Sequence, residues 1–339
     1  MDAQFKNLLE NYADHLPPAL WLDVHVAIAL SSGADSVALL RATLAIKRIC
    51  EGQGEIFALH VNHHLRGEES DGDALWCAEL CGKLGVPVQV LEGNVTARAQ
   101  AEGDGIEAAA RAERYTLLTE AAESRGARYL FLAHNRDDQV ETVLFRLLRG
   151  TGVRGLAGMA ESRPLTPALT LARPLLCCTR GEILEYLAKL GQDFRTDSSN
   201  AAREFTRNRI RAELLPLLRA DYNTQVDDAL LRLAGQAGEM QQFVEQNARE
   251  LLDTRRERVK VGEIVLRVVG LRDQPALLVS EALRLAWREA QFAEQAMTQE
   301  WWVALAALAM GGASNVVLNM PGDVRAEVVE GVLVVGGAG

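Results

Sequence analysis

A run of six small and polar residues has the composition of a loop that binds phosphate. The run consists of Ser31, Ser32, Gly33, Ala34, Asp35 and Ser36. Small side chains let a phosphate approach the backbone N–H groups, and the serine hydroxyls add donors. Because Asp35 would repel a phosphate, we predict that it ligates a Mg²⁺ ion that bridges the two. Capping of a helix by Ser or Asp is the alternative explanation for these residue types.

The elements on either side of this run would aim it at one spot. His25 to Leu30 is a short apolar run with β-branched residues, as in a buried strand. Apolar residues then recur at helical spacing from Val37 to Leu44. A strand, a turn and a helix in this order direct backbone N–H groups and a helix N-terminus toward one ligand. A Walker A loop would need a lysine and a dinucleotide fingerprint would need further glycines, and neither is present.

A second group of reactive residues begins at His134, directly after another predicted strand, 128–133. Asp138 and Glu141 are three positions apart and would share one face of a helix. Beside a phosphate loop these carboxylates would form a Mg²⁺ site or a general base. We therefore predict Asp35 and Asp138 as metal ligands. Acidic residues in a first turn also favour the helix dipole, which is the alternative without a function.

The order of the predicted elements indicates an α/β fold. Predicted strands at 25–30, 55–62, 86–91 and 128–133 alternate with helical patterns that begin at residues 37, 70, 105 and 134. Such alternation indicates crossover connections and a parallel, doubly wound sheet. Ligands bind such sheets at the carboxyl ends of the strands, where the polar residues named above lie. The Gly- and Pro-rich residues 150–174 are predicted to be loop, and 179–190 a helix.

The chain changes character after Pro216, which predicts two domains, 1–216 and 217–339. The second is predicted to be mainly helical, to about residue 250 and again over 275–310. Strand-like segments interrupt this pattern at 259–269 and 315–335.

Charge and cysteine content narrow the class of protein. The formal net charge of −10 argues against a general nucleic-acid binder but leaves room for a local basic patch, such as the arginine-rich segment 202–211. Solvated helix faces are the alternative explanation for that segment. The five cysteines form no CxxC pair, which favours free thiols in a reducing compartment. Without a signal-peptide pattern or a run of ~18 apolar residues, we expect a cytoplasmic protein.

Several segments together resemble one family. In the family's order, they are residues 31–36, 60–70, 106–115, 133–142, 149–152, 173–176 and 197–211. The loop resembles the pyrophosphate loop of PP-loop ATP pyrophosphatases, and within that superfamily the chain resembles the tRNA(Ile)-lysidine synthetases. The resemblance implies an adenine nucleotide alpha hydrolase-like sheet and covers residues 25–216.

The resemblance implies a ligase that forms a C–N bond in two steps. ATP adenylylates the C2 oxygen of the wobble cytidine in a tRNA(Ile) with a CAU anticodon. The ε-amine of free L-lysine then displaces AMP, which gives lysidine and changes codon reading from AUG to AUA. ATP and Mg²⁺ are required, and a homodimer is one option for the assembly.

The resemblance also implies roles for individual residues. Catalysis falls to Asp35, Arg111, Asp138 and Glu141. ATP binding falls to the six loop residues together with His60 and His134. Contacts to tRNA fall to Arg203, Arg207, Asn208 and Arg211. Within these sets, either Glu141 or Asp138 would position the lysine amine or take its proton, and Arg111 would stabilise a phosphate or pair with Glu107. The C-terminal domain would read the tRNA body and reject tRNA(Met).

Two positions depart from the family's pattern, because Ser32 and His64 stand where a glycine is usual. The backbone angles of Ser32 will show whether the loop keeps the family's shape. Three alternatives stay open: a tRNA 2-thiolation enzyme of the same superfamily, which the absence of CxxC disfavours; a glutamine-hydrolysing amide synthetase; and a non-catalytic nucleotide- or RNA-binding homologue.

Overall fold

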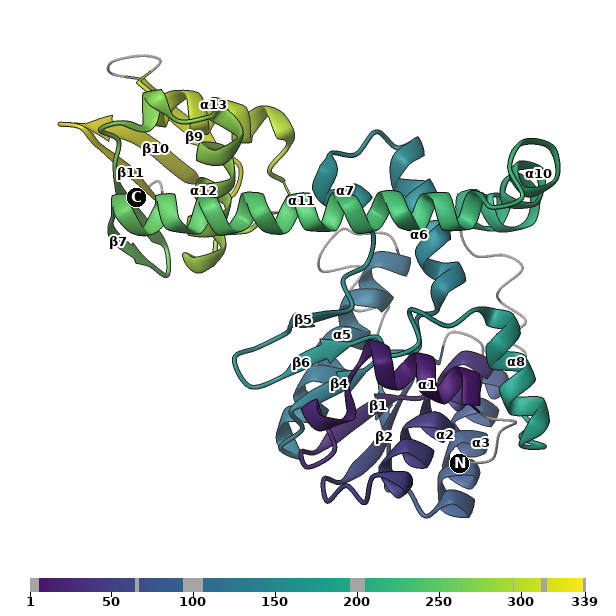
Figure 1. Cartoon of the computed structure of the whole chain (residues 1–339). Coiled ribbons are helices and arrows are strands. Elements are labelled where there is room, and N and C mark those ends of the chain that lie inside the picture. Colours follow the sequence, from purple (N-terminus) through teal and green to yellow (C-terminus); the bar gives the residue numbers. More distant parts are fainter. Residues whose placement is uncertain are drawn as a thin grey trace. The chain divides into compact units, whose positions relative to one another are not determined.

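The computed structural model describes residues 6–64, 67–93, 106–195, 205–294, 296–311 and 316–337. The chain folds into two compact units, which we call the N-terminal unit (Met1–Ala234) and the C-terminal unit (Gly235–Gly339) (Figure 1). Their division falls inside one long helix, α11 (Val226–Arg255). The functional boundary at residues 216 and 217 stays a prediction.

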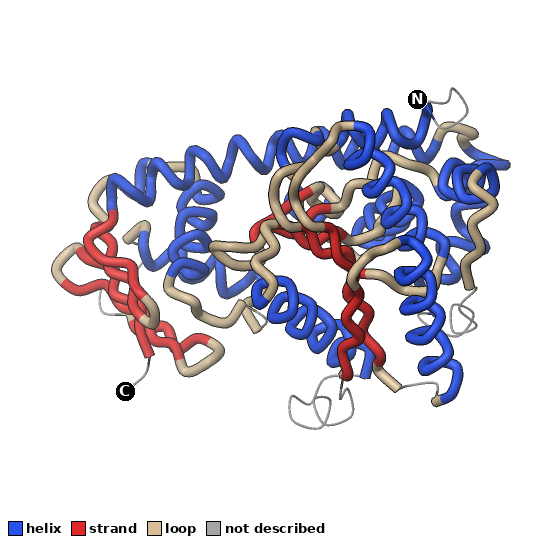
Figure 2. The backbone as a smooth tube through the Cα atoms, turned by 90° about the horizontal axis from the view of Figure 1, so that it is seen from below, coloured by secondary structure: helices blue, strands red, loops and turns tan. Residues whose placement is uncertain are grey.

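A six-stranded sheet forms the centre of the N-terminal unit (Figure 2). Its strands, in spatial order, are β3 (Val88–Glu92), β2 (Ile56–Asn62), β1 (Val26–Ala29), β4 (Tyr129–Phe131), β6 (Thr170–Ala172) and β5 (Ser162–Pro164). All neighbours pair in parallel except β5, which is antiparallel to β6 at the edge. The predicted parallel α/β sheet is confirmed.

Both faces of this sheet are covered, because side chains alternate along each strand. Ile28 and Phe131 belong to one buried cluster, whereas Ala27 and Phe57 belong to another on the opposite face. The first cluster includes residues of α1 (Lys6–His15), α2 (Ala34–Ile49), α3 (Glu68–Leu84) and α8 (Arg180–Lys189). The second includes residues of α5 (Ile106–Ser124). A short 3₁₀ turn, Pro18–Leu20, precedes β1.

The prediction that 150–174 is loop was wrong in part. This stretch contains the short helix α7 (Val153–Leu156) and the strand pair β5–β6. Leu171 and Ala172 are fully buried in the sheet, so pairing with β4 stabilises a strand only three residues long. Pro164 and Pro167 gave the turn signal that hid it.

A helical layer completes the N-terminal unit. α6 (Arg136–Leu148) contributes Val140, Val143 and Leu144 to a buried cluster with Ile210, Leu215 and the first turns of α11. Four short helical segments lead into α11. They are α9 (Phe205–Arg209), a π-helical turn (Ile210–Leu214), α10 (Leu215–Leu217) and a second π-helical turn (Leu218–Tyr222).

The C-terminal unit combines helices with an antiparallel sheet. The strand order is β7 (Arg256–Lys260), β8 (Glu263–Arg267), β11 (Val332–Gly337), β10 (Val324–Val329) and β9 (Val317–Met320). A 3₁₀ turn (Leu271–Asp273) leads to α12 (Ala276–Glu289) and α13 (Gln299–Ala309), which pack on the sheet around Trp287 and Trp302. The predicted strand-like segments form this sheet, and the predicted helical patterns form the helices. No helix in the described ranges is both long and apolar enough to cross a membrane.

Candidate active site

The predicted phosphate loop joins β1 to α2 at the carboxyl end of the sheet. The N-cap of α2 is Gly33, which has no side chain that could cap the helix. The first backbone N–H groups of α2 therefore have no side-chain cap. Ser36 holds the loop closed, because its Oγ accepts from the Ser31 N–H at 3.0 Å and lies 2.7 Å from the Ser31 carbonyl oxygen. A Cβ added at Gly33 would meet only the Ser31 Oγ, at 3.5 Å, so the space above the loop is open to a ligand.

Ser32 is accommodated without backbone strain, since it is not among the residues with positive φ. Its side chain is buried and donates to Asp73 Oδ1 at 2.9 Å. Arg195 Nε pairs with the same oxygen at 3.1 Å, and the Arg195 N–H donates to the Ser32 carbonyl oxygen at 2.8 Å. Serine at this position therefore introduces no left-handed backbone and has hydrogen-bond partners for its side chain and its carbonyl. His64, the other departure, does adopt a positive φ of 51°.

His60 supports the loop from the neighbouring strand, β2. The ring is buried, and Nδ1 lies 3.0 Å from the carbonyl oxygen of Leu30, the residue before the loop. Burial lowers the pKa of His60, so the ring is neutral and Nδ1 is the donor. This contact fixes the end of β1, and the predicted contact of His60 with ATP stays a prediction.

Asp35 lies in the first turn of α2, beside a cation from a distant helix. Arg180 Nη1, on α8, donates to Asp35 Oδ2 at 3.1 Å. The other carboxylate oxygen, Oδ1, is buried and has no hydrogen-bond partner among the residues that the structure describes. A buried carboxylate oxygen without a partner is costly unless a cation or donor completes it.

The second predicted carboxylate group opens α6, as expected from its sequence. Asn135 caps the helix through a capping box, in which Asp138 Oδ2 accepts the Asn135 N–H at 3.0 Å. Asp138 Oδ1 lies 3.3 Å from Arg211 Nη2, and Arg211 also pairs closely with the buried Glu141. Burial, with the negative charges of Asp35 and Glu141, raises the pKa of Asp138 to about 6, against the opposing effect of Arg211.

His134 lies at the carboxyl end of β4 and is held neutral. Burial, with the positive charges of Arg173 and Arg111, lowers the pKa of His134 to about 3. Arg173 Nε donates to His134 Nδ1 at 3.2 Å, so the ring proton is on Nε2. His134 therefore presents a neutral N–H donor, which suits a phosphate or nucleotide oxygen.

These side chains meet at a small cavity of about 100 Å³. It is lined by Arg111, His134, Asp138, Glu141, Thr142, Arg146, Met159 and Arg207. Five of them were predicted from the sequence, so the structure brings residues from α5, the end of β4, α6 and α9 to one place. Arg146 closes one side by donating to the carbonyl oxygens of Gly155 and Gly158, at 3.0 and 2.6 Å.

Some predicted residues are not placed in this cavity. Arg203 and the side chain of Glu107 lie outside the described residues. Asn208 lies on α9, next to Arg207. Arg111 does line the cavity, and its guanidinium also lies 5.2 Å from the ring centre of Tyr115 on the same helix. The sequence reasoning missed Arg180, Asp73, Arg173 and Arg195, whose partners are far away in the chain.

The carboxylates fit a Mg²⁺ ion shared with a ligand. Among the described residues, no three His, Cys, Asp or Glu side chains converge as a complete metal site. Mg²⁺ is typically held by one or two carboxylates together with substrate phosphates. The unpartnered Asp35 Oδ1 and the partly exposed Asp138 offer that donor set.

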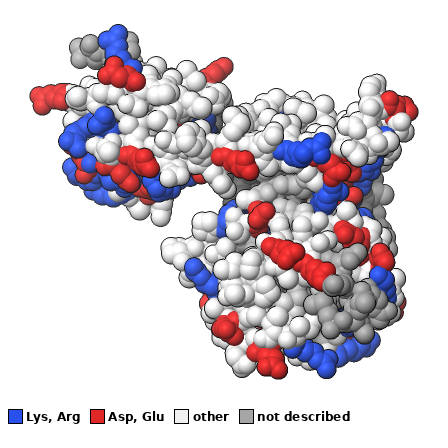
Figure 3. Space-filling model, viewed as in Figure 1, with Lys and Arg blue, Asp and Glu red and all other residues white. Residues whose placement is uncertain are grey.

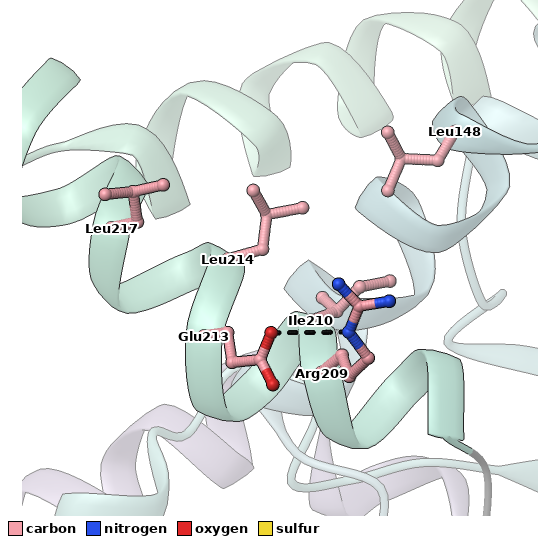
Figure 4. Close-up of a pocket in the computed structure, with 6 residues that line it drawn as sticks. All are labelled: Leu148, Arg209, Ile210, Glu213, Leu214 and Leu217. Atoms are coloured by element: carbon pink, nitrogen blue, oxygen red, sulfur yellow. Dashed lines mark hydrogen bonds and ion pairs between the residues drawn. The ribbon is translucent and has the colours of Figure 1, made fainter.

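A larger, mainly apolar cavity of about 340 Å³ lies elsewhere in the N-terminal unit (Figure 4). Its lining consists of Leu148, Arg209, Ile210, Glu213, Leu214 and Leu217. Arg209 and Glu213 form an ion pair at 3.3 Å, and the other side chains that line the cavity are aliphatic and carry no reactive group (Figure 4). None of the predicted catalytic or ATP-binding residues lines it, so we place the active site at the smaller, polar cavity.

Comparison with known proteins shows which proteins the chain is similar to. A curated tRNA(Ile)-lysidine synthase of Bacteroides thetaiotaomicron is 40% identical over 254 residues, which cover 75% of this chain and 56% of that protein. The protein of the same name from Bacillus subtilis is 40% identical over 196 residues, covering 58% of this chain and 41% of that one. The chain thus spans about half the length of the curated relatives it matches.

Among solved structures, a U34-tRNA thiolase, NcsA from Methanococcus maripaludis with its [4Fe-4S] cluster, superposes with a TM-score of 0.59 at 16% identity. The superposition covers 69% of this chain and 80% of that one, and at this identity it shows a shared fold. The sequence model of the PP-loop domain matches residues 2–218, which is well over half of the chain. The chain therefore belongs to the PP-loop family.

Proposed function

We propose that this protein is an ATP-dependent ligase that joins free L-lysine to the wobble cytidine of a tRNA(Ile) with a CAU anticodon. The observation that carries the proposal is the cavity in which Asp138, Glu141, His134 and Arg111 converge, close to Asp35 of the PP-loop. The name of the relatives, tRNA(Ile)-lysidine synthase, supplies the reaction. The product would be lysidine, which reads AUA instead of AUG.

In the first step the C2 oxygen of the wobble cytidine attacks the α-phosphorus of ATP, and pyrophosphate leaves. The uncapped amides at the start of α2 would hold the phosphates of the leaving group. Asp35 and Asp138 would hold Mg²⁺, which supplies positive charge against the charge developing on the phosphates. The neutral His134 and the cation of Arg111, which line the same cavity, would donate to the nucleotide.

In the second step the ε-amine of lysine forms a C–N bond at C2, and AMP leaves with the former C2 oxygen. Lysine's ammonium has a free pKa of ~10.4, so it must lose a proton before it attacks. Glu141 and Asp138 are both suited to hold the ammonium, because they lie together and already bind a cation, Arg211. Once Mg²⁺ has left with pyrophosphate, the carboxylate of Asp138, whose pKa is about 6 in the metal-free site, would be suited to accept this proton.

The arginine-rich segment would grip the tRNA. Arg207 lines the cavity with its guanidinium 5.4 Å from the ring centre of Phe145, and Asn208 and Arg211 follow it. Arg203 is assigned to the same contact from its sequence alone. The C-terminal unit would read the tRNA body, and Figure 3 shows basic side chains among acidic ones on the part of it that Figure 1 labels β7. We place the enzyme in the cytoplasm, where tRNA, ATP and lysine meet, with a homodimer as one option.

The test is incubation with ATP, Mg²⁺, labelled lysine and an unmodified tRNA(Ile) transcript. We expect label in the tRNA only when ATP is present. A tRNA(Met) transcript, which has the same anticodon, is the matched control and should stay unlabelled. In a parallel incubation with a labelled sulfide donor in place of lysine, incorporation of sulfur would favour the thiolation enzyme. Nucleotide binding without turnover in either incubation would favour the non-catalytic homologue.

A further inference from the structure

Arg180 contacts the phosphate loop from α8, a helix far from the loop in the sequence. It is the first residue of α8, and its guanidinium donates to Asp35 Oδ2 at 3.1 Å. Its backbone N–H donates to Asp137 Oδ2 at 2.9 Å, which ties the start of α8 to the first turn of α6. The main chain of Arg180 is thus fixed next to both carboxylate groups, while its side chain is about half exposed, at 45%.

The fold of α8 gives no reason for a cation at this position. A positive charge in the first turn opposes the helix dipole. The helix is capped by Thr179 and Glu182, in a capping box that does not involve the Arg180 side chain. What Arg180 gains from its position is the contact with Asp35, which suggests a role at the loop.

Mg²⁺ at Asp35 would weaken the attraction between this carboxylate and Arg180. Asp35 Oδ1 is buried and has no hydrogen-bond partner among the described residues, so it is open to Mg²⁺, whereas Oδ2 accepts from the guanidinium. When a Mg²⁺–nucleotide complex enters, the cation competes for this carboxylate, and phosphate oxygens arrive directly above the loop. A guanidinium released from Asp35 then lies within a side chain's reach of those oxygens, and its planar fork suits them.

We propose that Arg180 binds the phosphates that leave as pyrophosphate, exchanging Asp35 for their oxygens when ATP binds. This inference rests on the proposed use of ATP and adds a residue to that site. The α-phosphate must stay accessible to the cytidine oxygen, so the contact of Arg180 would be with the β- and γ-phosphates. Arg180 should therefore contribute to binding of ATP and pyrophosphate and not of AMP.

The test measures ligand binding by calorimetry in the presence of Mg²⁺, with ATP, pyrophosphate and AMP as ligands. For Arg180→Gln we expect ATP and pyrophosphate to bind about 10- to 100-fold more weakly, as for loss of a charge-assisted hydrogen bond. AMP should bind as it does to wild type. Arg180→Lys keeps the charge without the fork and should fall between.

The matched control is Arg125→Gln. Arg125 also forms an arginine–carboxylate pair, with Glu55 at 3.0 Å, but at the amino end of β2, away from the loop. It should leave the affinity for all three ligands unchanged. A loss of AMP binding in Arg180→Gln equal to the loss of ATP binding would overturn the inference, because it would indicate general damage to the site.

A double variant separates contact with phosphate from an effect through Asp35. If Arg180 touches the phosphates, Asp35→Asn/Arg180→Gln should bind pyrophosphate about tenfold more weakly than Asp35→Asn alone. Equal affinity of these two variants would reduce Arg180 to orienting Asp35 and would contradict the proposal. Wild type that binds ATP but fails to ligate lysine would refute the proposed function and leave this result standing. Wild type that binds neither ATP nor pyrophosphate would refute both.

Discussion

The adenylylation step should have an acid limb near pH 6, set by Asp138. Burial and two neighbouring carboxylates raise the pKa of Asp138 to about 6, and the proposed metal role needs the ionised form. Below this pKa the carboxylate takes up a proton, so activity is lost as the pH falls. From pH 7 to pH 5 the ionised fraction falls from about 0.9 to about 0.1, roughly tenfold, whereas an aspartate with a pKa of ~3.9 would stay almost fully ionised.

The assay is single-turnover release of pyrophosphate with the tRNA transcript and without lysine, at Mg²⁺–ATP well below saturation, so that the rate constant reports the ionisation of Asp138 in the metal-free site. Lysine is left out because the neutral fraction of its ε-amine falls tenfold for each unit by which the pH falls below its pKa of ~10.4. In the complete reaction this change would mask the acid limb of Asp138. His134 does not interfere, since its pKa of about 3 lies below the range. A rate constant that is flat between pH 7 and pH 5 would refute the assignment of Asp138.

Two substitutions should move this limb in opposite directions. Glu141→Gln removes a negative charge that raises the pKa of Asp138, so the limb should shift to lower pH. Arg211→Gln removes a positive charge that lowers it, so the limb should shift to higher pH. The residual activity of each variant suffices, because only the position of the limb is compared. Shifts in the same direction would show that another group titrates.

Other substitutions test the remaining parts of the site. Asp35→Ala should abolish pyrophosphate release while the circular dichroism spectrum stays native, and near-normal turnover would remove Asp35 from the metal role. Arg207→Ala should weaken tRNA binding and lower the slope of log affinity against log salt by about 1, and an effect on ATP affinity alone would contradict its assignment to tRNA. Asp73→Ala leaves the buried Ser32 hydroxyl without its acceptor and should lower the free energy of unfolding in urea by about 1–3 kcal/mol. Adding Ser32→Gly should recover part of that loss, and purely additive losses would show that the two side chains are not coupled.

The sequence predicted the parts of the site that are contiguous in the chain. The phosphate loop follows a strand and opens α2, and the carboxylates open α6 after β4, because each pattern of strand, turn and helix is encoded within about twenty residues. The loop and the carboxylates are expected to lie close together, because the carboxyl ends of parallel strands meet at the same edge of the sheet. The family resemblance added Arg111 and Arg207, which no local pattern distinguishes from surface arginines.

Contacts between distant residues could not be predicted in this way. Arg180 and Asp35 are 145 positions apart, and Ser32 and Asp73 are 41 apart. β6 was missed for the same reason, since its three residues become a strand only through pairing with β4. One local signal for Arg180 was available, because the helix predicted over 179–190 has a cation in its first turn, where the helix dipole disfavours it.

The most direct test of the central claim is the chemical identity of the modified nucleoside. A tRNA(Ile) transcript with a CAU anticodon would be incubated with the protein, ATP, Mg²⁺ and lysine, digested, and analysed by mass spectrometry. The account predicts lysidine in place of the wobble cytidine, formed with ATP and absent without it. An unchanged cytidine, or a thiolated base at that position, would contradict it.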